Sequence, residues 1–172
     1  SQWRVLEDRP TAPQQTQVDR AAAAQGELFQ SLFARLQGEM KAGGPASAIA
    51  VCKKAAPALA REVGAKHGVR IGRTSWKLRN PTNTPPGWFA LVAGDRPQAT
   101  RILADRTGRV GYVAPIRIMS GCLACHGPRE SIAPDVLERL EALYPSDEAT
   151  GFAEGDLRGW FWVQVPPAPG AD

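Results

Sequence analysis

Residues 101–118 read RILADRTGRVGYVAPIRI, and this stretch decides the fold class. Two runs of strand-forming residues flank the sequence DRTG at residues 105–108. The glycine at position 108 supplies the positive φ that a tight turn between two strands requires. The stretch therefore predicts a β-hairpin and, with it, an antiparallel sheet.

A long helix is predicted ahead of the hairpin, over residues 18–40. Apolar side chains recur there at the spacing of one helix face, at Ala21, Ala24, Leu28, Leu32, Leu36 and Met40. We expect Thr16 or Asp19 to cap the start of this helix, and the glycines at positions 43 and 44 to end it.

A second helix is predicted from Pro45 toward Gly64. Proline suits the first turn of a helix, because the N–H that it lacks would have no partner there. Pro57 lies inside the same helix, where it removes a backbone hydrogen bond. We therefore expect a kink just after Cys52.

The remaining elements complete the fold class. A short helix is predicted at residues 88–93, another begins at Pro134, and residues 160–165 form a last strand. Two long helices followed by strands, with a loop and a helix between them, are typical of an α+β fold. We expect an antiparallel sheet flanked by helices.

Length and composition favour one globular domain. The chain has 172 residues, and no apolar run is long enough to span a membrane as a helix. It begins without a recognisable leader, so no signal or membrane anchor is visible in it. We expect a flexible lead-in at residues 1–15, the domain at residues 16–165, and a disordered tail at residues 166–172.

The charge pattern argues against a nucleic-acid partner. The net charge is +4, but the arginines are scattered along the chain rather than gathered in one element. A nucleic-acid-binding surface would combine a basic cluster with interleaved aromatic residues or a known motif, and neither is present.

The stretch GCLACHG at residues 121–127 carries the chemistry. It contains two of the three cysteines and one of the two histidines in the chain. Cys-x-x-Cys-His is the attachment signature of c-type haem. The thiols of Cys122 and Cys125 can form thioethers with the two vinyl groups of one porphyrin, and His126 then lies beneath the iron. We expect one covalently bound haem c.

Two other interpretations of the cysteine pair are weaker. A redox-active disulfide usually opens a helix in a thioredoxin-like context, which this sequence lacks. A zinc site would need further ligands, for which Cys52 and His67 are the candidates, but no second paired motif has zinc-finger spacing.

The second axial ligand is left open by the residues alone. The candidates are Met40, Met119, His67 and Cys52. Met40 belongs to the apolar stripe of the first helix, and Met119 stands too close to Cys122 to reach the opposite side of the ring. His67 has the position of an exposed residue at a helix end. Cys52 lies on the apolar face of its helix, and the neighbouring lysines 53 and 54 would favour its thiolate form. The alternative interpretation is that Cys52 is a small buried apolar residue of the core.

Four stretches in order resemble a known family. They are AIAVCKKAAPALA (48–60), GRTSWKLRNPTNTPPGW (72–88), CLACHG (122–127) and YPSDEATGFAEGDLRGWFWV (144–163). The family is a haem-binding domain family with a PAS-like fold, formerly catalogued as a domain of unknown function. It includes a cyanobacterial c-type haem protein with His/Cys ligation, and the resemblance covers about residues 46–165.

The resemblance implies roles for single residues. Cys122 and Cys125 look like the thioether residues, His126 like the proximal ligand and Cys52 like the distal ligand. Within LRNP, Arg79 and Asn80 match the family pattern, and such a segment could line the haem. Phe89 stands where the family pattern has an acidic residue, which puts the local loop contacts in doubt. The implied fold is a PAS-like antiparallel sheet flanked by helices, which agrees with the order of elements read from the sequence.

These expectations lead to a functional hypothesis. A thiolate opposite an imidazole stabilises ferric iron, so we expect a low reduction potential. Loss of Cys52 on reduction would open a site for CO or NO, which suits a redox or diatomic-gas sensor. The alternative is a small electron-transfer cytochrome that serves a larger redox enzyme. A haem enzyme is not expected, because only His67 is available for acid–base work.

Two further expectations concern the cellular location and the partners of the haem propionates. Attachment of haem c takes place outside the cytoplasm, so we expect a periplasmic or equivalent location; the redox or signalling partner is not identified by the sequence. Arg70, Arg73 and Arg79 are candidates to pair with the haem propionates, which need charge-assisted donors.

Overall fold

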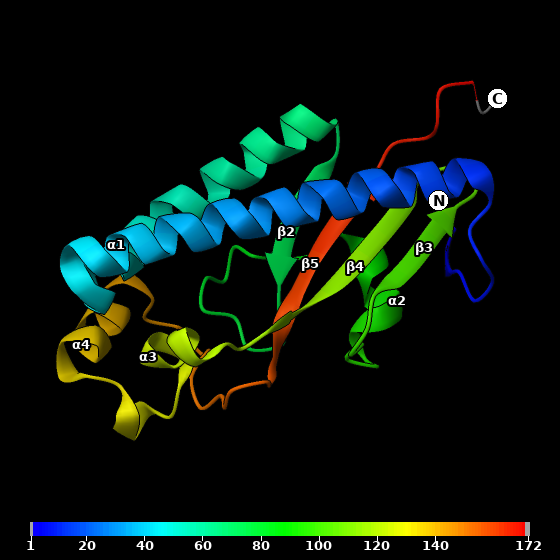
Figure 1. Ribbon diagram of the computed structural model, residues 1–172. Helices are drawn as coiled ribbons and strands as arrows, with labels where there is room; N and C mark the ends of the chain where they lie inside the picture. Colours follow the sequence, from blue (N-terminus) through cyan, green and yellow to red (C-terminus); the bar gives the residue numbers. More distant parts are fainter. Residues whose placement is uncertain (1, 171–172) are drawn as a thin grey trace.

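A five-stranded antiparallel sheet lies beneath one long helical hairpin in the computed structural model, which describes residues 2–170 except the side chain of Val51 (Figure 1). The strands lie in the order β1-β3-β4-β5-β2. Their bounds are Trp3–Val5 (β1), Arg70–Thr74 (β2), Arg101–Asp105 (β3), Val110–Arg117 (β4) and Leu157–Val165 (β5). The predicted α+β class, with an antiparallel sheet flanked by helices, is confirmed.

The helices are one very long element and three short ones. Their bounds are Ala12–His67 (α1), Ala90–Ala93 (α2), Leu123–His126 (α3) and Pro134–Leu143 (α4), with single 3-10 turns at Gly87–Phe89 (η1), Ser120–Cys122 (η2) and Arg129–Ser131 (η3). Among the described residues, no helix is both long and apolar enough to cross a membrane.

The predicted hairpin is the centre of the sheet. Strands β3 and β4 pair with Arg101 opposite Val113. The Asp105 carboxylate accepts hydrogen bonds from the backbone N–H groups of Thr107 and Arg109, both at 3.0 Å, and Gly108 has φ 84°. Glycine is therefore required at the position where the sequence predicts it.

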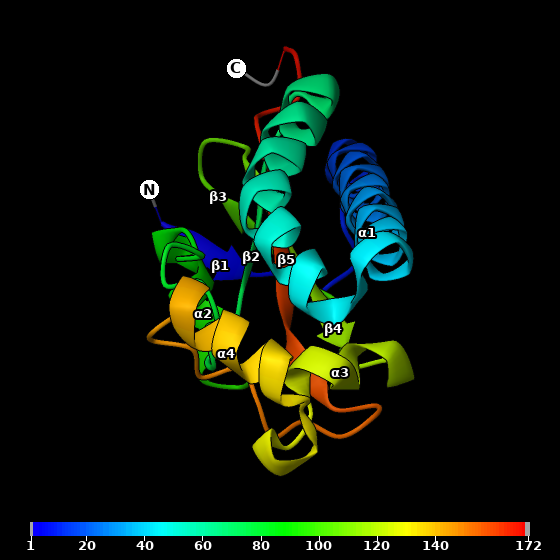
Figure 2. The same cartoon turned by 90° about the vertical axis from the view of Figure 1, so that its left-hand side faces the viewer.

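The helix α1 consists of two arms that fold back on each other at Gly44, which has φ 77° and ψ −178°. Figure 2 shows the two arms side by side above the sheet. The predicted pair of long helices is thus present. Pro57 lies within helical backbone, since Gly44 is the only residue of α1 with non-helical dihedral angles. The predicted kink after Cys52 is therefore not a break in the helix.

The beginning of the chain differs from the prediction. Thr11, rather than Thr16 or Asp19, caps α1 through a capping box with Gln14. Residues 3–5 form the edge strand β1, so the predicted lead-in at residues 1–15 contains a strand and the first turn of α1. Trp3 stacks on Trp88 with ring centroids 5.2 Å apart. This aromatic contact stabilises the strand although the segment is mostly polar. Residues 166–170 have no regular structure, and residues 171–172 of the predicted tail lie outside the described residues.

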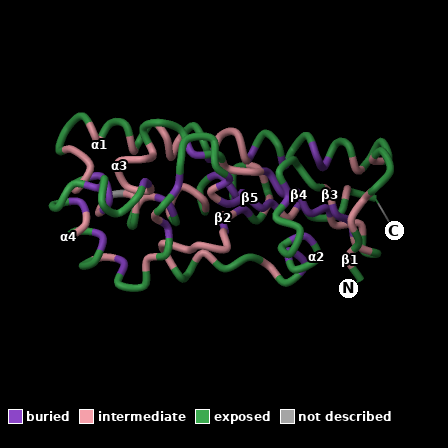
Figure 3. Tube along the Cα trace, turned by 90° about the horizontal axis from the view of Figure 1, so that it is seen from below, coloured by how far each residue is buried: buried purple, intermediate pink, exposed green. Residues whose placement is uncertain are grey.

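The sheet has a core on each face. The face under α1 buries apolar side chains of both layers: Ala21, Leu28, Val63, Ile71, Val110, Phe161 and Val163. The opposite face is covered by η1 and α2 and is rich in aromatic residues: Trp88, Phe89, Trp160 and Trp162. In Figure 3 the buried segments follow the strands, while much of α1 is exposed. Side chains along β5 alternate between the two cores, as a strand covered on both faces requires.

The closed end of the α1 hairpin extends beyond the sheet. There it packs on α4, and α3 lies between α4 and the end of β4 (Figures 1 and 2). The apolar contacts at this end join Ile49 of the second arm to Val136, Leu140 and Tyr144 of α4. This arrangement brings the second arm of α1 close to the cysteine-rich segment.

Candidate functional site

The segment Cys122–His126 begins where the chain leaves β4. The backbone is tied to the loop before β5 by two hydrogen bonds, from Ile118 N to Asp156 O at 2.9 Å and from Gly155 N to Ile118 O at 2.8 Å. The turns η2 and α3 follow, and their helical spacing puts Cys122 and Cys125 on the same side of the segment. Both thiols are free and half-buried.

His126 is held by its Nδ1 atom. Nδ1 donates a hydrogen bond to the carbonyl oxygen of Ala149 at 2.8 Å, so the lone pair of a neutral imidazole lies on Nε2. Burial lowers the pKa of His126 well below its usual value, and the charges of Arg79 and Arg158 lower it further. The imidazole is therefore neutral, and the Ala149 carbonyl fixes its tautomer, which is the form that ligates a metal.

Arg79 braces the carbonyl that orients His126. Its Nη2 donates to the carbonyl oxygens of Ala149, at 3.1 Å, and of Cys125, while its Nε pairs with Asp147 Oδ1 at 3.1 Å. The same carboxylate oxygen accepts the N–H of Ala149 at 2.8 Å. Arg79 thus belongs to the site, but these hydrogen bonds are directed at the protein backbone and Asp147. The other carboxylate oxygen, Asp147 Oδ2, is buried without a hydrogen-bond partner among the described residues.

Asn80 has only local polar contacts in the described part of the chain. Its side-chain oxygen accepts hydrogen bonds from the backbone N–H of Thr82 at 3.0 Å and from the Thr82 hydroxyl at 2.7 Å. This pattern is an Asx turn, which shapes the loop after β2. The structure therefore gives Asn80 a role in the loop and no contact with the cysteine-rich segment.

Cys52 lies half-buried on the second arm of α1. Burial raises the pKa of its thiol, and the charge of Arg73 on β2 is the largest influence in the opposite direction. A Cys52 thiolate would in turn raise the pKa of Cys125 and of Tyr144. Cys52 therefore lies within electrostatic range of the Cys122–His126 segment, although the two are far apart in sequence.

The lysines beside Cys52 do not supply the positive charge that the sequence predicts there. Lys53 is exposed, donates to the carbonyl oxygen of Leu143 at 2.7 Å, and lies 5.2 Å from the ring centre of Tyr144. Lys54 is exposed as well. Consecutive residues of a helix point in different directions, so charge next to Cys52 in sequence is not charge next to its sulfur. Arg73, from another element, takes that place.

The other candidate axial ligands are placed differently. His67 lies at the open end of the α1 hairpin, where its Nε2 contacts Glu27 Oε2 at 2.5 Å. Since a helix rises 1.5 Å per residue, His67 is about 22 Å along the arm from Cys52. The two cannot share one metal, so the alternative zinc site is wrong. The described residues also contain no cluster of three or more His, Cys, Asp or Glu suited to a metal ion.

The two methionine candidates lie on different elements. Met119 is 37% exposed, and its backbone carbonyl accepts a hydrogen bond from the N–H of Cys122. Met40 is half-buried on the first arm of α1.

Two of the candidate arginines, Arg70 and Arg73, lie on opposite faces of β2. Arg70 lies on the face away from α1, with its guanidinium 5.9 Å from the ring centre of Trp162. Arg73 shares the face of the buried Ile71, beneath α1. Because successive side chains of a strand point to opposite faces, the sequence alone predicts that Arg70 and Arg73 lie on different faces of β2.

Sequence reasoning missed Arg158, Tyr144 and Asp147. The Arg158 guanidinium donates to the carbonyl oxygen of Lys77 at 3.0 Å and lies 5.5 Å from the ring centre of Phe152. Burial, reinforced by the neighbouring arginines, lowers the pKa of Arg158 to about 10. All three lie in the stretch 144–163 that resembles the family, but nothing within that stretch marks them as site residues, because they reach the site from a loop and from the bulged start of β5.

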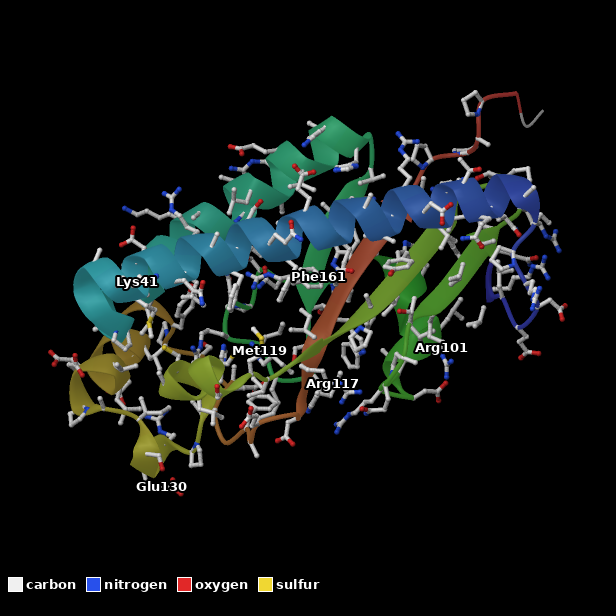
Figure 4. All side chains as sticks on the ribbon, in the orientation of Figure 1. Lys41, Arg101, Arg117, Met119, Glu130 and Phe161 are labelled. Atoms are coloured by element: carbon white, nitrogen blue, oxygen red, sulfur yellow. The ribbon has the colours of Figure 1, made fainter. Side chains whose placement is uncertain are left out.

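A half-exposed apolar surface lies between α1, β5 and α3. Phe29 is 38% exposed, stacks on Phe33 with centroids 5.8 Å apart, and meets Phe161 edge to face at 6.4 Å. Figure 4 shows Phe161 and Met119 beneath the first arm of α1, next to the start of α3. Two thiols beside a neutral imidazole are the groups that attach and ligate a c-type haem, and the Cys52 thiol is a candidate for the second axial ligand.

Comparisons with known proteins bear on the whole chain. The sequence model of the family described as "Tll0287-like: Tll0287" matches residues 7–166. The chain is also similar to the structure described as the crystal structure of the cyanobacterial heme-protein Tll0287, with 27% sequence identity and a TM-score of 0.65. That similarity covers 94% of this chain and 100% of the other. A search of curated proteins gives no match.

Proposed function

This chain belongs to the Tll0287-like family, and on that premise we propose that it is a haem-binding protein whose haem is covalently attached. Cys122 and Cys125 would form the two thioethers. His126 would be one axial ligand, and Cys52 would be the other. The observation that carries the proposal is the neutral imidazole of His126, with Nδ1 bound to the Ala149 carbonyl and Nε2 available.

The residues around the site have separate tasks in this proposal. A bound haem supplies one-electron chemistry. The Ala149 carbonyl fixes the ring orientation of His126, and the Arg79–Asp147 pair keeps that carbonyl in place. The apolar side chains of Phe29 and Met119, which are partly exposed, would shield a bound porphyrin from water. If His126 and Cys52 both bound the iron, no coordination site would be open to a substrate, so we do not propose an enzyme activity.

We assign the haem protein to sensing of redox state or of a diatomic gas such as CO or NO, outside the cytoplasm in the periplasm. Support comes from the placement of Cys52. It lies on a helical arm that joins the rest of α1 through Gly44, and Lys53 links the same arm to the end of α4. Release of the sulfur would therefore remove one of the contacts that hold this arm against the rest of the protein, beside the contact of Lys53 with α4. A low reduction potential follows from the anionic sulfur donor.

Electron transfer to a larger redox enzyme is the second candidate function. The half-exposure of Cys122 and Cys125 favours it, because it leaves one edge of an attached haem near the surface, within reach of a partner protein.

One pair of variants tests the ligands. Ferric absorption and EPR spectra of the wild type and of Cys52→Ala are compared, with Met119→Ala as the control for the other nearby sulfur. We expect Cys52→Ala to lose the thiolate signature and Met119→Ala to keep it. An unchanged spectrum in Cys52→Ala refutes the distal assignment, and colourless protein after expression with the cytochrome maturation machinery refutes haem attachment.

Reduction then separates the two functions. Loss of sulfur ligation and uptake of CO by the reduced protein support the sensor. Rapid, reversible electron exchange without ligand change supports the carrier.

A further inference from the structure

Arg73 is a cation without an anionic partner in the described part of the chain. It lies in the middle of β2 and is half-buried, yet no hydrogen bond or ion pair to its guanidinium is formed by the described residues. Burial lowers the pKa of Arg73, which means that its charge is poorly solvated. A half-buried guanidinium to which the described residues offer no anion is available to an anionic ligand atom.

The geometry of β2 directs Arg73 to the site. In the ladder of β2 and β5, Arg73 is opposite Phe161, so its side chain lies on the face beneath α1. Figure 4 shows Phe161 on that face. The strand follows α1 after the turn at Gly68 and returns along the second arm, which it contacts (Figure 1). Each residue of a strand advances about 3.3 Å, so Arg73 lies nearer to Cys52 than Ile71 does.

The groups that stabilise the charge of Arg73 are few. In their anionic forms, the sulfur of Cys52, first, and the oxygen of Tyr144 would raise the pKa of Arg73. Neither is a carboxylate. Other charges around Cys52 come from the first arm of α1, where Arg35 favours its thiolate and Glu39 opposes it.

We propose that Arg73 is the charge partner of the Cys52 sulfur and, through it, a positioning residue that raises the reduction potential of the bound haem. The inference rests on the proposed function. A thiolate donor lowers the potential, and a guanidinium beside it draws electron density from the sulfur and stabilises the reduced form, which carries one more negative charge. The reduction potential of the haem is therefore higher than imidazole and thiolate ligation alone would make it.

The test compares Arg73→Gln with Arg70→Gln in the haem-loaded protein. Both variants remove one positive charge from the same strand, but Arg70 lies on the opposite face of the sheet. In redox titrations against a one-electron mediator, we expect Arg73→Gln to change the equilibrium constant about tenfold toward the oxidised form, which is ~59 mV lower. Arg70→Gln is expected to leave it unchanged. Arg73→Lys, which keeps the charge, should retain most of the wild-type value and shows whether folding tolerates a change at this position.

A double-mutant cycle separates the sulfur from the haem propionates as the partner of Arg73. If Arg73 acts through Cys52, the shift caused by Arg73→Gln shrinks in the Cys52→Ala background. An equal shift in both backgrounds means that the guanidinium pairs with a propionate and overturns the proposal. Equal potentials for Arg73→Gln and Arg70→Gln overturn it as well.

A second measurement keeps the failure of this inference distinct from that of the proposed function. The iron–sulfur stretching frequency in resonance Raman spectra is expected to shift in Arg73→Gln only. If the wild type shows sulfur ligation but the frequency is unmoved, the ligand assignment stands and the role of Arg73 is wrong. If the wild type shows no sulfur ligation, the assignment of Cys52 itself fails.

Discussion

Replacement of Arg79 by methionine tests the brace that orients His126. The substitution removes the guanidinium but keeps a side chain of similar length. It leaves the Asp147 carboxylate, whose side chain is 6% exposed, without its cation, and it deprives the carbonyl oxygens of Cys125 and Ala149 of a donor. Removal of one partner of a buried ion pair costs about 3–5 kcal/mol, because the other charge stays buried and uncompensated.

The comparison variant is Arg129→Met. Arg129 pairs with Glu141 at the same distance, 3.1 Å, but the side chains are 51% and 69% exposed. An exposed pair contributes about 0–1 kcal/mol. The pairing distance alone would make the two substitutions equal. Burial makes them differ, as do the two further hydrogen bonds that Arg79 donates to backbone carbonyls.

Urea unfolding followed by circular dichroism measures both. We expect Arg79→Met to lose about 3–5 kcal/mol of unfolding free energy and Arg129→Met less than about 1 kcal/mol. In the double variant Arg79→Met/Asp147→Asn no charge is left buried, so part of the loss should return. A loss below about 1 kcal/mol in Arg79→Met, or no recovery in the double variant, would refute the reasoning.

Three further predictions concern the backbone and the pH dependence. Gly44→Ala should cost about 1 kcal/mol in thermal unfolding, because φ 77° is strained for alanine although no atom lies near its added Cβ; an unchanged melting temperature contradicts this. Gly72→Ala should shift tryptophan fluorescence and destabilise the fold, because its Cβ would lie 2.6 Å from the Trp162 ring, whereas Gly94→Ala, with open space around it, should be neutral. In the haem-free chain, burial lowers the pKa of His126 below 6.5, so the unfolded chain binds more protons and stability should fall as the pH drops below about 6.5. His126→Gln should flatten that dependence in urea titrations at several pH values, and an equally steep slope would show that another group is responsible.

Local signals were enough for most of the fold. The turn residues at 105–108 defined the β3–β4 hairpin, and the glycines at 43 and 44 marked the turn of α1, because backbone requirements there are met by few residue types. Strand β1 could not be predicted from local sequence, because its pairing with β3 and the stacking of Trp3 on Trp88 are long-range contacts. Tertiary packing thus overrode a polar composition.

The site was predictable only where its chemistry is contiguous in sequence. Cys122, Cys125 and His126 form one motif, and the resemblance added Cys52. The brace of Arg79 with Asp147 joins two loops, and neither Tyr144 nor Arg158 carries a pattern of its own. The positive charge near Cys52 was assigned to its sequence neighbours, whereas the fold supplies it from β2.

The turn of α1 at Gly44 has a consequence for folding experiments. Cys52 reaches the site only when the second arm has docked on α4 and β2, whereas a thioether-linked haem would stay on Cys122 and Cys125 even in the denatured chain. Colour would then persist through denaturation, while the sulfur-ligated spectrum would vanish with the docking of that arm. The protein would thus carry its own optical probe of a single long-range tertiary contact.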